Sequence, residues 1–274
     1  MVTKLVQQAK NLTKQIIGLE DFHYEPSLKV NPNLLTTTHI IVACFPKSGS
    51  TYLTKLLAEI TGFQLGSTSQ FFGQNEQDIH EYKLRKFCRD NFIVQQHLKA
   101  TNNNLLILQA YQLRPIILLR NIFDAILSLQ DHIEKQSHLS PTGYIHQKYF
   151  EMTKEEQLLF LIHIHLPWYF NFFVSWREAS PKIDTLWLSY EELFANQPDT
   201  LSKILKFYNI DKNPAKIESA ISSMTSKKTR LNVGISGRGA QMPEMHKEAV
   251  YNLARVWQLS PQDMEIIGLK EVSN

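Results

Sequence analysis

The sequence predicts an α/β fold in which a central parallel β-sheet is flanked by helices. Short β-branched runs typical of strands alternate along the chain with helical patterns, which is the order of elements in a parallel sheet. The first run, His39–Phe45 (HIIVACF), is continuously apolar at its centre, as expected for a strand covered on both faces.

The expected strands and helices follow one another along most of the chain. The strands are His39–Phe45, Asn91–Gln95, Arg114–Leu119 and Thr185–Ser189. A helical pattern over Tyr52–Ile60 ends at Gly62, because glycine readily adopts the left-handed conformation that closes a helix. A second helix is expected over Ile122–His132, and the rest is mostly helical with a loop at Thr229–Gln241.

The most apolar stretch, Leu158–Val174, is interrupted by polar residues and by Pro167. A helix that crosses a bilayer needs about 20 nearly uniform apolar residues. We therefore expect a buried helix that breaks near Pro167, where the backbone lacks a hydrogen-bond donor. No stable membrane anchor is expected.

The composition disfavours several classes of protein. The chain has 274 residues with 29 Lys and Arg against 26 Asp and Glu, and the net charge of +3 is too small to indicate nucleic-acid binding. Such an excess suits a small anionic ligand if positive charge gathers at one place. The two cysteines, Cys44 and Cys88, form no metal-binding or disulfide pattern and indicate reduced thiols in a cytoplasm. We expect a single domain over residues 1–274.

Four polar side chains follow the carboxyl ends of the expected strands. They are Lys47, His97, Arg120 and Tyr190. Ligands of open α/β sheets bind beyond these strand ends. If the strands are parallel, the four side chains face one crevice.

The segment after the first strand, Pro46–Thr51 (PKSGST), joins a buried strand to a helix. Backbone N–H groups and the positive helix end at such a turn suit an anion. Gly49 allows the backbone to approach a ligand closely, and Lys47 adds a positive charge. Because the lysine precedes the glycine, the segment lacks the GxxxxGK[ST] spacing of magnesium-dependent NTPases. A plain strand-to-helix turn capped by Ser48 or Ser50 is the alternative.

A second candidate segment, RNIFDAILS, begins at Arg120. The planar guanidinium is a rigid fork that suits a phosphate. Ser128 lies about two turns into the expected helix, on a face that can approach the PKSGST segment. Taken alone, each residue would be interpreted as a surface arginine or a helix-face serine.

Together these segments resemble the nucleotide-binding motifs of the sulfotransferases that use 3′-phosphoadenosine 5′-phosphosulfate (PAPS). Leu186–Leu193 (LWLSYEEL) resembles the strand-and-tyrosine segment of that family, and Asn232–Gly239 resembles its glycine-rich 3′-phosphate loop. The resemblance covers roughly residues 40–257 and implies a P-loop-like sheet.

The resemblance implies transfer of a sulfuryl group from PAPS to an acceptor hydroxyl or amine, by in-line displacement and without a metal. Lys47 matches the lysine that stabilises charge on the bridging oxygen as 3′,5′-ADP leaves. His97, in QQHLKAT, matches the histidine that takes the acceptor's proton.

The resemblance also assigns residues to the donor. Those implied for the 5′-phosphate side are Lys47, Ser48, Gly49, Ser50 and Thr51. Those implied for the 3′-phosphate are Arg120, Ser128, Asn232, Gly234 and Arg238. Those implied for the adenine are Tyr52, Tyr190 and Ser219, with plain packing as the alternative for the two tyrosines. Gln95 and Val233 depart from the family, because many members have lysine at these positions, and Arg230 or Arg238 is near enough to compensate.

The acceptor side is expected in residues 63–89 and 130–173. Their aromatic side chains suit a small-molecule or glycan acceptor, and core packing is the alternative for each. They are Phe71, Phe72, Tyr144, Tyr149, Phe150, Trp168 and Tyr169. Two other functions stay open: a catalytically inactive module that binds 3′,5′-ADP or PAPS, and a nucleotide kinase, against which the missing NTPase lysine argues. The sequence assigns no oligomeric state.

Overall fold

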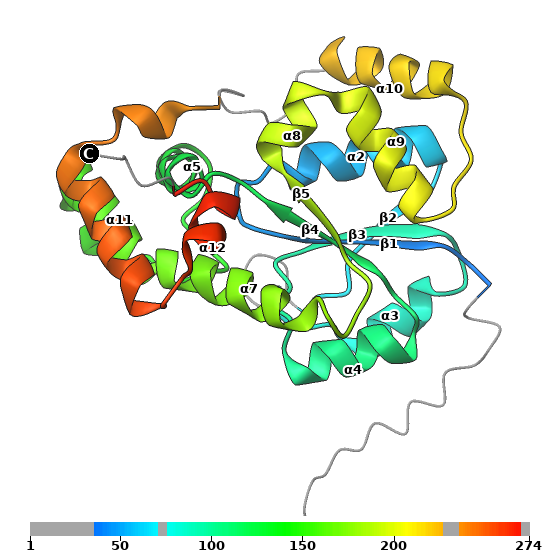
Figure 1. Ribbon diagram of the computed structural model, residues 1–274, viewed down its shortest axis with the longest axis horizontal. Helices are drawn as coiled ribbons and strands as arrows, with labels where there is room; N and C mark the ends of the chain where they lie inside the picture. The colour runs from blue at the N-terminus through cyan, green and yellow to red at the C-terminus, as the bar shows by residue number, and fades with distance from the viewer. Residues whose placement is uncertain (1–35, 71–75, 227–235, 270–274) are drawn as a thin grey trace, which may run out of the picture.

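The computed structural model describes residues 36–70, 76–226 and 236–269, and a parallel sheet lies at its centre (Figure 1). The five strands run in the order β2-β3-β1-β4-β5, with every neighbouring pair parallel. Their bounds are β1 His39–Cys44, β2 Gln64–Gly66, β3 Phe92–Gln96, β4 Pro115–Leu119 and β5 Leu186–Ser189. The predicted fold class is confirmed.

All four expected strands are present, and each end lies within one residue of its predicted position. The fifth strand, β2, was not predicted. It has three residues, QLG, without a β-branched side chain, and it lies at the edge of the sheet with Leu65 half exposed. Pairing with β3 in the folded sheet, rather than local sequence, makes this segment a strand.

Helices cover both faces of the sheet (Figure 1). On one face lie α2 Ser50–Thr61, α8 Tyr190–Ala195, α9 Gln197–Phe207 and α10 Pro214–Ser226. On the other lie α3 Glu81–Phe87, α4 Asn102–Ala110, α5 Ile122–Lys135, α6 Lys154–Ile164 and α7 Leu166–Ala179. The remaining helical elements are η2 Gln147–Glu151, η3 Arg238–Gln241, α11 Glu244–Val256 and α12 Pro261–Ile266.

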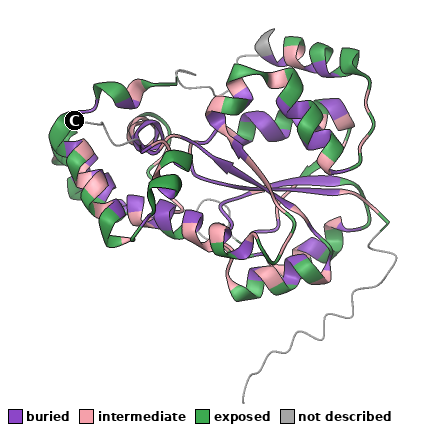
Figure 2. Cartoon of the chain, in the orientation of Figure 1, coloured by how far each residue is buried: buried purple, intermediate pink, exposed green. Residues whose placement is uncertain are grey.

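Strand β1 shows why the sheet is buried on both sides (Figure 2). Its successive side chains point to opposite faces. Ile40 and Val42 pack with α2 and α9, whereas Ile41 and Ala43 pack into the larger cluster formed with α4, α5 and α7. A strand in this position needs apolar residues at every place, which explains the continuous apolar run.

The long apolar stretch forms two helices. Helix α6 ends at Ile164, His165 lies between the helices, and α7 starts with Pro167 in its first turn, so the predicted break near Pro167 is confirmed. Lys154–Ala179 is long and apolar enough to pass a length-and-composition test for a membrane span, but 56% of its most apolar window is buried inside the molecule. Core helices of soluble proteins pass the same test.

Two further expectations concern helix and loop boundaries. Gly62 closes α2 in the left-handed conformation, with φ 75°, and its N–H donates to the Ala58 carbonyl, as predicted. Residues 229–235 of the expected loop Thr229–Gln241 lie outside the described residues. The expectation was wrong for its last residues, because Arg238–Gln241 forms the short 3-10 helix η3 against α5. The contacts of Gly239 with α5 set this local structure, and they join residues far apart in sequence.

Candidate active site

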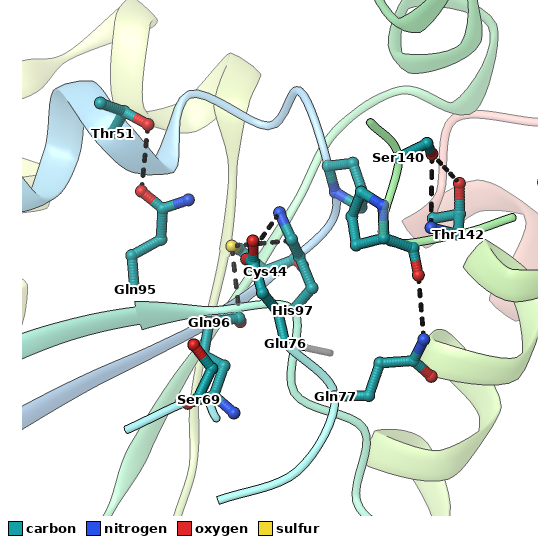
Figure 3. Close-up of polar contacts among 12 residues, drawn as sticks. Cys44, Thr51, Ser69, Glu76, Gln77, Gln95, Gln96, His97, Ser140 and Thr142 are labelled. Carbon is teal, nitrogen blue, oxygen red and sulfur yellow. Dashed lines mark hydrogen bonds and ion pairs between the residues drawn. The ribbon is translucent and has the colours of Figure 1, made fainter. Parts of the chain in front are cut away.

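The four strand-end residues meet at the carboxyl edge of the sheet. In the β1–β3 register Ala43 pairs with Gln96, so the next residues, Cys44 and His97, lie side by side. His97 Nδ1 is 2.9 Å from the Cys44 carbonyl oxygen (Figure 3). Because a carbonyl oxygen only accepts, Nδ1 carries the hydrogen and Nε2 of the neutral ring is left as the basic atom.

Arg120 joins the other two strand ends. Its Nη1 donates to the Lys47 carbonyl at 2.9 Å, and its guanidinium lies 4.1 Å from the centre of the Tyr190 ring. A cation over an aromatic face is attracted by the ring quadrupole. Arg120 is 7% exposed, so a full positive charge is held nearly buried beside the PKSGST segment.

The PKSGST segment forms a tight turn before α2. Lys47 and Gly49 both adopt positive φ, 67° and 81°. The buried Ser48 hydroxyl donates to the Phe45 carbonyl at 2.8 Å. A Cβ at Gly49 would lie 2.9 Å from the Tyr190 ring, so glycine is required both by the backbone conformation and by the approach of this tyrosine.

The residues that open α2 point in different directions. Ser50 is buried, and its side chain interacts with the Cys44 thiol. Thr51 donates to Gln95 Oε1 at 3.0 Å, so the glutamine that replaces a family lysine reaches this turn. Tyr52 is buried, packs on the Phe194 ring and donates to Gln197 Oε1 at 2.9 Å. Its contacts match core packing between α2, α8 and α9.

Helix α5 holds the second candidate segment. The Asn121 side chain caps the helix by accepting from the N–H groups of Phe123 and Asp124. One turn after Arg120, the Asp124 carboxylate lies 4.0 Å from Arg120 Nη2 and is 1% exposed. Ser128 is also buried on this helix, at 7% exposed.

Asp124 connects α5 to the glycine-containing segment near the C-terminus. Its two oxygens accept from the N–H groups of Gly237, at 2.7 Å, and Gly239, at 2.6 Å. A Cβ at Gly239 would lie 2.4 Å from Phe123 Cβ, which explains the glycine. Sequence reasoning missed Asp124, although an acidic residue in the first turn of a helix that begins just after Arg120 was an available signal.

The other predicted 3′-phosphate and adenine residues are placed less closely together. Arg238 forms an ion pair with Asp131 of α5, with Nη1 2.7 Å from Oδ2. Ser219 is exposed on α10. Asn232 and Gly234 lie outside the described residues, as do Arg230 and Val233.

His97 lies in a nearly buried pocket of polar and aromatic groups. Its Nε2 is 3.6 Å from Glu76 Oε2, its Nδ1 is 3.6 Å from Cys44 Sγ, and the Trp168 ring stands edge-on beside it. Burial lowers the pKa of His97, and the neighbouring Lys47 charge acts in the same direction. The Glu76 carboxylate and the Cys44 carbonyl oppose this lowering of the pKa. Sequence reasoning missed Glu76, because nothing local distinguishes it from a surface glutamate.

Comparison with known proteins gives the family. A family model described as the sulfotransferase domain matches residues 37–233, which include the PKSGST and RNIFDAILS segments.

The chain belongs to the sulfotransferase domain family. Its fold is similar to that of the mouse sulfotransferase SULT7A1 complexed with PAP, with a TM-score of 0.63, 18% identity, and coverage of 84% of this chain and 87% of that chain. It is also similar to a retinol dehydratase in complex with retinol and PAP, with a TM-score of 0.51, 13% identity, and coverage of 86% and 83%. No curated protein matches the sequence.

In this sulfotransferase, Phe71 and Phe72 lie outside the described residues, and the other aromatic residues expected on the acceptor side divide into two groups. Tyr149, Trp168 and Tyr169 are buried, and the Tyr169 hydroxyl donates to the Pro46 carbonyl next to Lys47. Tyr144 is 82% exposed and Phe150 is 41% exposed. Trp168 is therefore the member of the set that contacts His97 directly.

Metal ligands are not grouped in the described part of this sulfotransferase. In residues 36–70, 76–226 and 236–269, no three His, Cys, Asp or Glu side chains are arranged so that they could hold a metal ion. In the described residues, positive charge at the carboxyl edge of the sheet comes from the side chains of Lys47 and Arg120.

Proposed function

We propose that this sulfotransferase moves the sulfuryl group of PAPS to a hydroxyl or amine of a small-molecule or glycan acceptor, by in-line displacement at sulfur. The observation that carries the proposal is the meeting of Lys47, His97 and Arg120 at the carboxyl ends of β1, β3 and β4. This arrangement puts a basic nitrogen and two cations at one edge of the sheet. PAP, bound by both similar solved proteins, is the product that PAPS leaves after transfer.

The donor's 5′-phosphate side is assigned to the turn before α2. Lys47 and Gly49 adopt left-handed backbone conformations, and Ser48 between them does not. Turns of this kind direct successive N–H groups toward an anion. Ser48, Ser50 and Thr51 continue this turn into the positive end of α2.

The 3′-phosphate is assigned to Arg120 and Ser128. The segment with Gly237 and Gly239, which Asp124 holds, completes this side of the site. Arg120 is oriented by the Lys47 carbonyl and by Tyr190, so its fork is already positioned. A nucleotide without the 3′-phosphate would lose its contact with this positioned guanidinium, which makes the 3′-phosphate a selectivity element. Arg238, Asn232 and Gly234 are proposed to complete the phosphate site, with Tyr190, Tyr52 and Ser219 toward the adenine.

The chemistry is divided between two residues. Lys47 stabilises the charge that develops on the bridging oxygen as the bond between that oxygen and sulfur breaks. His97 Nε2 accepts the acceptor's proton as the new bond to sulfur forms. Retinol and androsterone, which a retinol dehydratase binds beside PAP, are small apolar alcohols, and they support a small-molecule acceptor as the first class to test.

The decisive experiment compares two nucleotides that differ by one phosphate. We expect 3′,5′-ADP to raise the melting temperature of the full chain well above the effect of 5′-AMP, because only the former reaches Arg120. PAPS is then incubated with a panel of alcohols, phenols, amines and sugars, and release of 3′,5′-ADP is measured.

Each alternative has its own signature. Equal stabilisation by 5′-AMP and 3′,5′-ADP would contradict the assigned 3′-phosphate site. Binding of 3′,5′-ADP without transfer to any acceptor would favour an inactive binding module, and magnesium-dependent consumption of ATP would favour a kinase. Transfer that continues in the presence of EDTA would agree with a reaction driven by Lys47 without a metal.

Residues 1–274 are proposed to form a single cytoplasmic domain that does not bind nucleic acid. The family match spans residues 37–233, and one sheet organises both hydrophobic clusters. The cysteines Cys44 and Cys88 are buried free thiols, which supports a reducing compartment.

A further inference from the structure

A glutamate without an assigned function faces the basic atom of His97. Glu76 is 4% exposed, and its Oε2 lies 3.6 Å from His97 Nε2. The opposite nitrogen, Nδ1, is already engaged with the Cys44 carbonyl. The carboxylate therefore lies beside the one ring atom that is free to take a proton.

The segment that carries Glu76 is held in place by buried amide side chains. Asn104 is fully buried, and its Nδ2 donates to the Gln77 carbonyl at 2.9 Å, while its Oδ1 accepts from the Ile79 N–H at 3.0 Å. Gln96, the residue before His97, donates to the Asp78 carbonyl at 2.7 Å. These bonds tie the backbone after Glu76 to α4 and to the end of β3, so the position of the carboxylate is determined by the core.

The charged and titratable groups around His97 come from several elements. Lys47 follows β1 and adds a positive charge, and the Cys44 thiol on β1 is held in its neutral form because burial raises its pKa to about 12. On α7, burial raises the pKa of the Tyr169 hydroxyl, so this group is also neutral. Glu76 is thus the negative partner that the described groups provide for an imidazolium at position 97.

We infer that Glu76 is a positioning residue for proton transfer, whose carboxylate stabilises the imidazolium that forms on His97 as the acceptor attacks. This inference rests on the proposed function. In the step, the acceptor oxygen or nitrogen forms a bond to sulfur, the bond between sulfur and the bridging phosphate oxygen breaks, and 3′,5′-ADP leaves with that electron pair. The acceptor's proton moves to His97 Nε2, where the Glu76 carboxylate balances the new positive charge, and the proton later passes to water.

The sign of the effect follows from the charges. A carboxylate within about 4 Å favours the protonated ring, so the Glu76 carboxylate raises the pKa of His97 and opposes the lowering caused by burial. Removing the negative charge in Glu76→Gln therefore lowers that pKa, whereas Glu76→Asp keeps the charge and most of the effect. A purely structural role for Glu76 would not move the titration of the ring in this way.

The first test needs no acceptor. Histidine ring nitrogens of the full chain are followed by NMR against pH, and His97→Gln identifies the signals of His97. We expect a hydrogen on Nδ1 in the neutral wild-type ring and a lower His97 pKa in Glu76→Gln, with the wild-type value largely kept in Glu76→Asp. An unchanged His97 pKa in folded Glu76→Gln would overturn the inference.

The second test uses turnover. In Glu76→Gln, the acid limb of the pH profile of kcat/KM should move to lower pH, because His97 without the neighbouring negative charge is protonated only at lower pH. At high pH, kcat should fall by up to about tenfold, because a base of lower pKa is a weaker proton acceptor. The affinity for 3′,5′-ADP should stay unchanged, and in a His97→Gln background the second substitution should add nothing.

The outcomes separate the inference from the proposed function. If Glu76→Gln lowers the His97 pKa but no acceptor is sulfated, the pairing of Glu76 with His97 is supported and the proposed function is contradicted. If transfer occurs and the acid limb is the same in Glu76→Gln and wild type, the proposed function stands and the inference fails. An equal loss of kcat caused by Glu76→Gln with and without His97 would also overturn it.

Discussion

Two buried carboxylates lie at the carboxyl edge of the sheet, on opposite sides of Lys47. Asp124 follows β4 and is 1% exposed, whereas Glu76 lies near the end of β3 and is 4% exposed. Asp124 accepts from two backbone N–H groups, which cannot titrate, and Glu76 faces an imidazole, which can. From similar burial we therefore propose different roles: Asp124 organises the proposed donor side, and Glu76 stabilises the charge of the proposed base.

The largest expected effect is the loss of kcat when His97, on the acceptor side, is replaced. His97→Gln should lower kcat by about 10²- to 10⁴-fold, because the acceptor loses its general base. Affinity for 3′,5′-ADP, measured by isothermal titration, should not change, because His97 does not belong to the donor side. The exposed His163 of α6 provides a matched control, and His163→Gln should leave both quantities unchanged. Full activity in His97→Gln would contradict the proposal that His97 is the general base.

The next effect concerns the residue between the two sides. Lys47→Ala should lower kcat by about 10²- to 10³-fold, as expected when a group that stabilises a developing negative charge is lost. The chain should still fold, because the Lys47 side chain is not part of either hydrophobic cluster. Lys55→Ala, on the exposed face of α2, is the control. Transfer at the wild-type rate in Lys47→Ala would rule out the proposed leaving-group role.

The third effect concerns Asp124 on the donor side, and it is tested with Asp124→Asn. An amide cannot accept from both glycine N–H groups, so the free energy of unfolding should fall by about 1–3 kcal/mol and 3′,5′-ADP should bind more weakly. Asp131→Asn removes the ion pair with Arg238 from the same helix and should cost at most about 1 kcal/mol. Denaturant unfolding and titration measure both effects.

Because the N–H partners of Asp124 do not titrate, the acid limb of the pH profile should stay in place in Asp124→Asn. If the acid limb moved in Asp124→Asn as it does in Glu76→Gln, the two carboxylates would not differ in their effect on the pKa of His97.

The last expected effect concerns the turn that both sides share. Gly49→Ala should cost about 1–2 kcal/mol for the left-handed backbone, with a further cost for the contact with Tyr190. Gly62, at the other end of α2, has a similar φ and open space where the alanine methyl group would lie, so Gly62→Ala isolates the backbone cost. Equal losses of the free energy of unfolding in the two variants would show that the approach of Tyr190 to Gly49 is unimportant.

The fold and part of the site were accessible from sequence for a simple reason. Strands buried on both faces are apolar at nearly every position, so β1 and β4 stand out from their surroundings, and the apolar runs of β3 (FIV) and β5 (LWL) are also visible in the sequence. The parallel arrangement then places Lys47, His97, Arg120 and Tyr190 at one edge, whatever the details of packing. Strand β2 was missed because Leu65 is its only large apolar residue, and pairing with β3 makes it a strand.

The partners of these residues depended on contacts between distant segments. Asp124 meets Gly237 and Gly239 across 113 and 115 positions, and no local pattern encodes such a contact. The adenine role predicted for Tyr52 came from the family resemblance, which gave no sign that its hydroxyl donates to Gln197, 145 residues away.

The sequence by itself determined four of the five strands, their ends and the polar residues that follow them, because an apolar run and the residues beside it are local properties. The tertiary structure decided which charges face one another. Glu76 became the partner of His97 because Asn104 and Gln96 hold its segment beside β3, and these hydrogen bonds exist only once the chain is folded. Pairing of buried charges is a property of distance in space, which the order of residues does not specify.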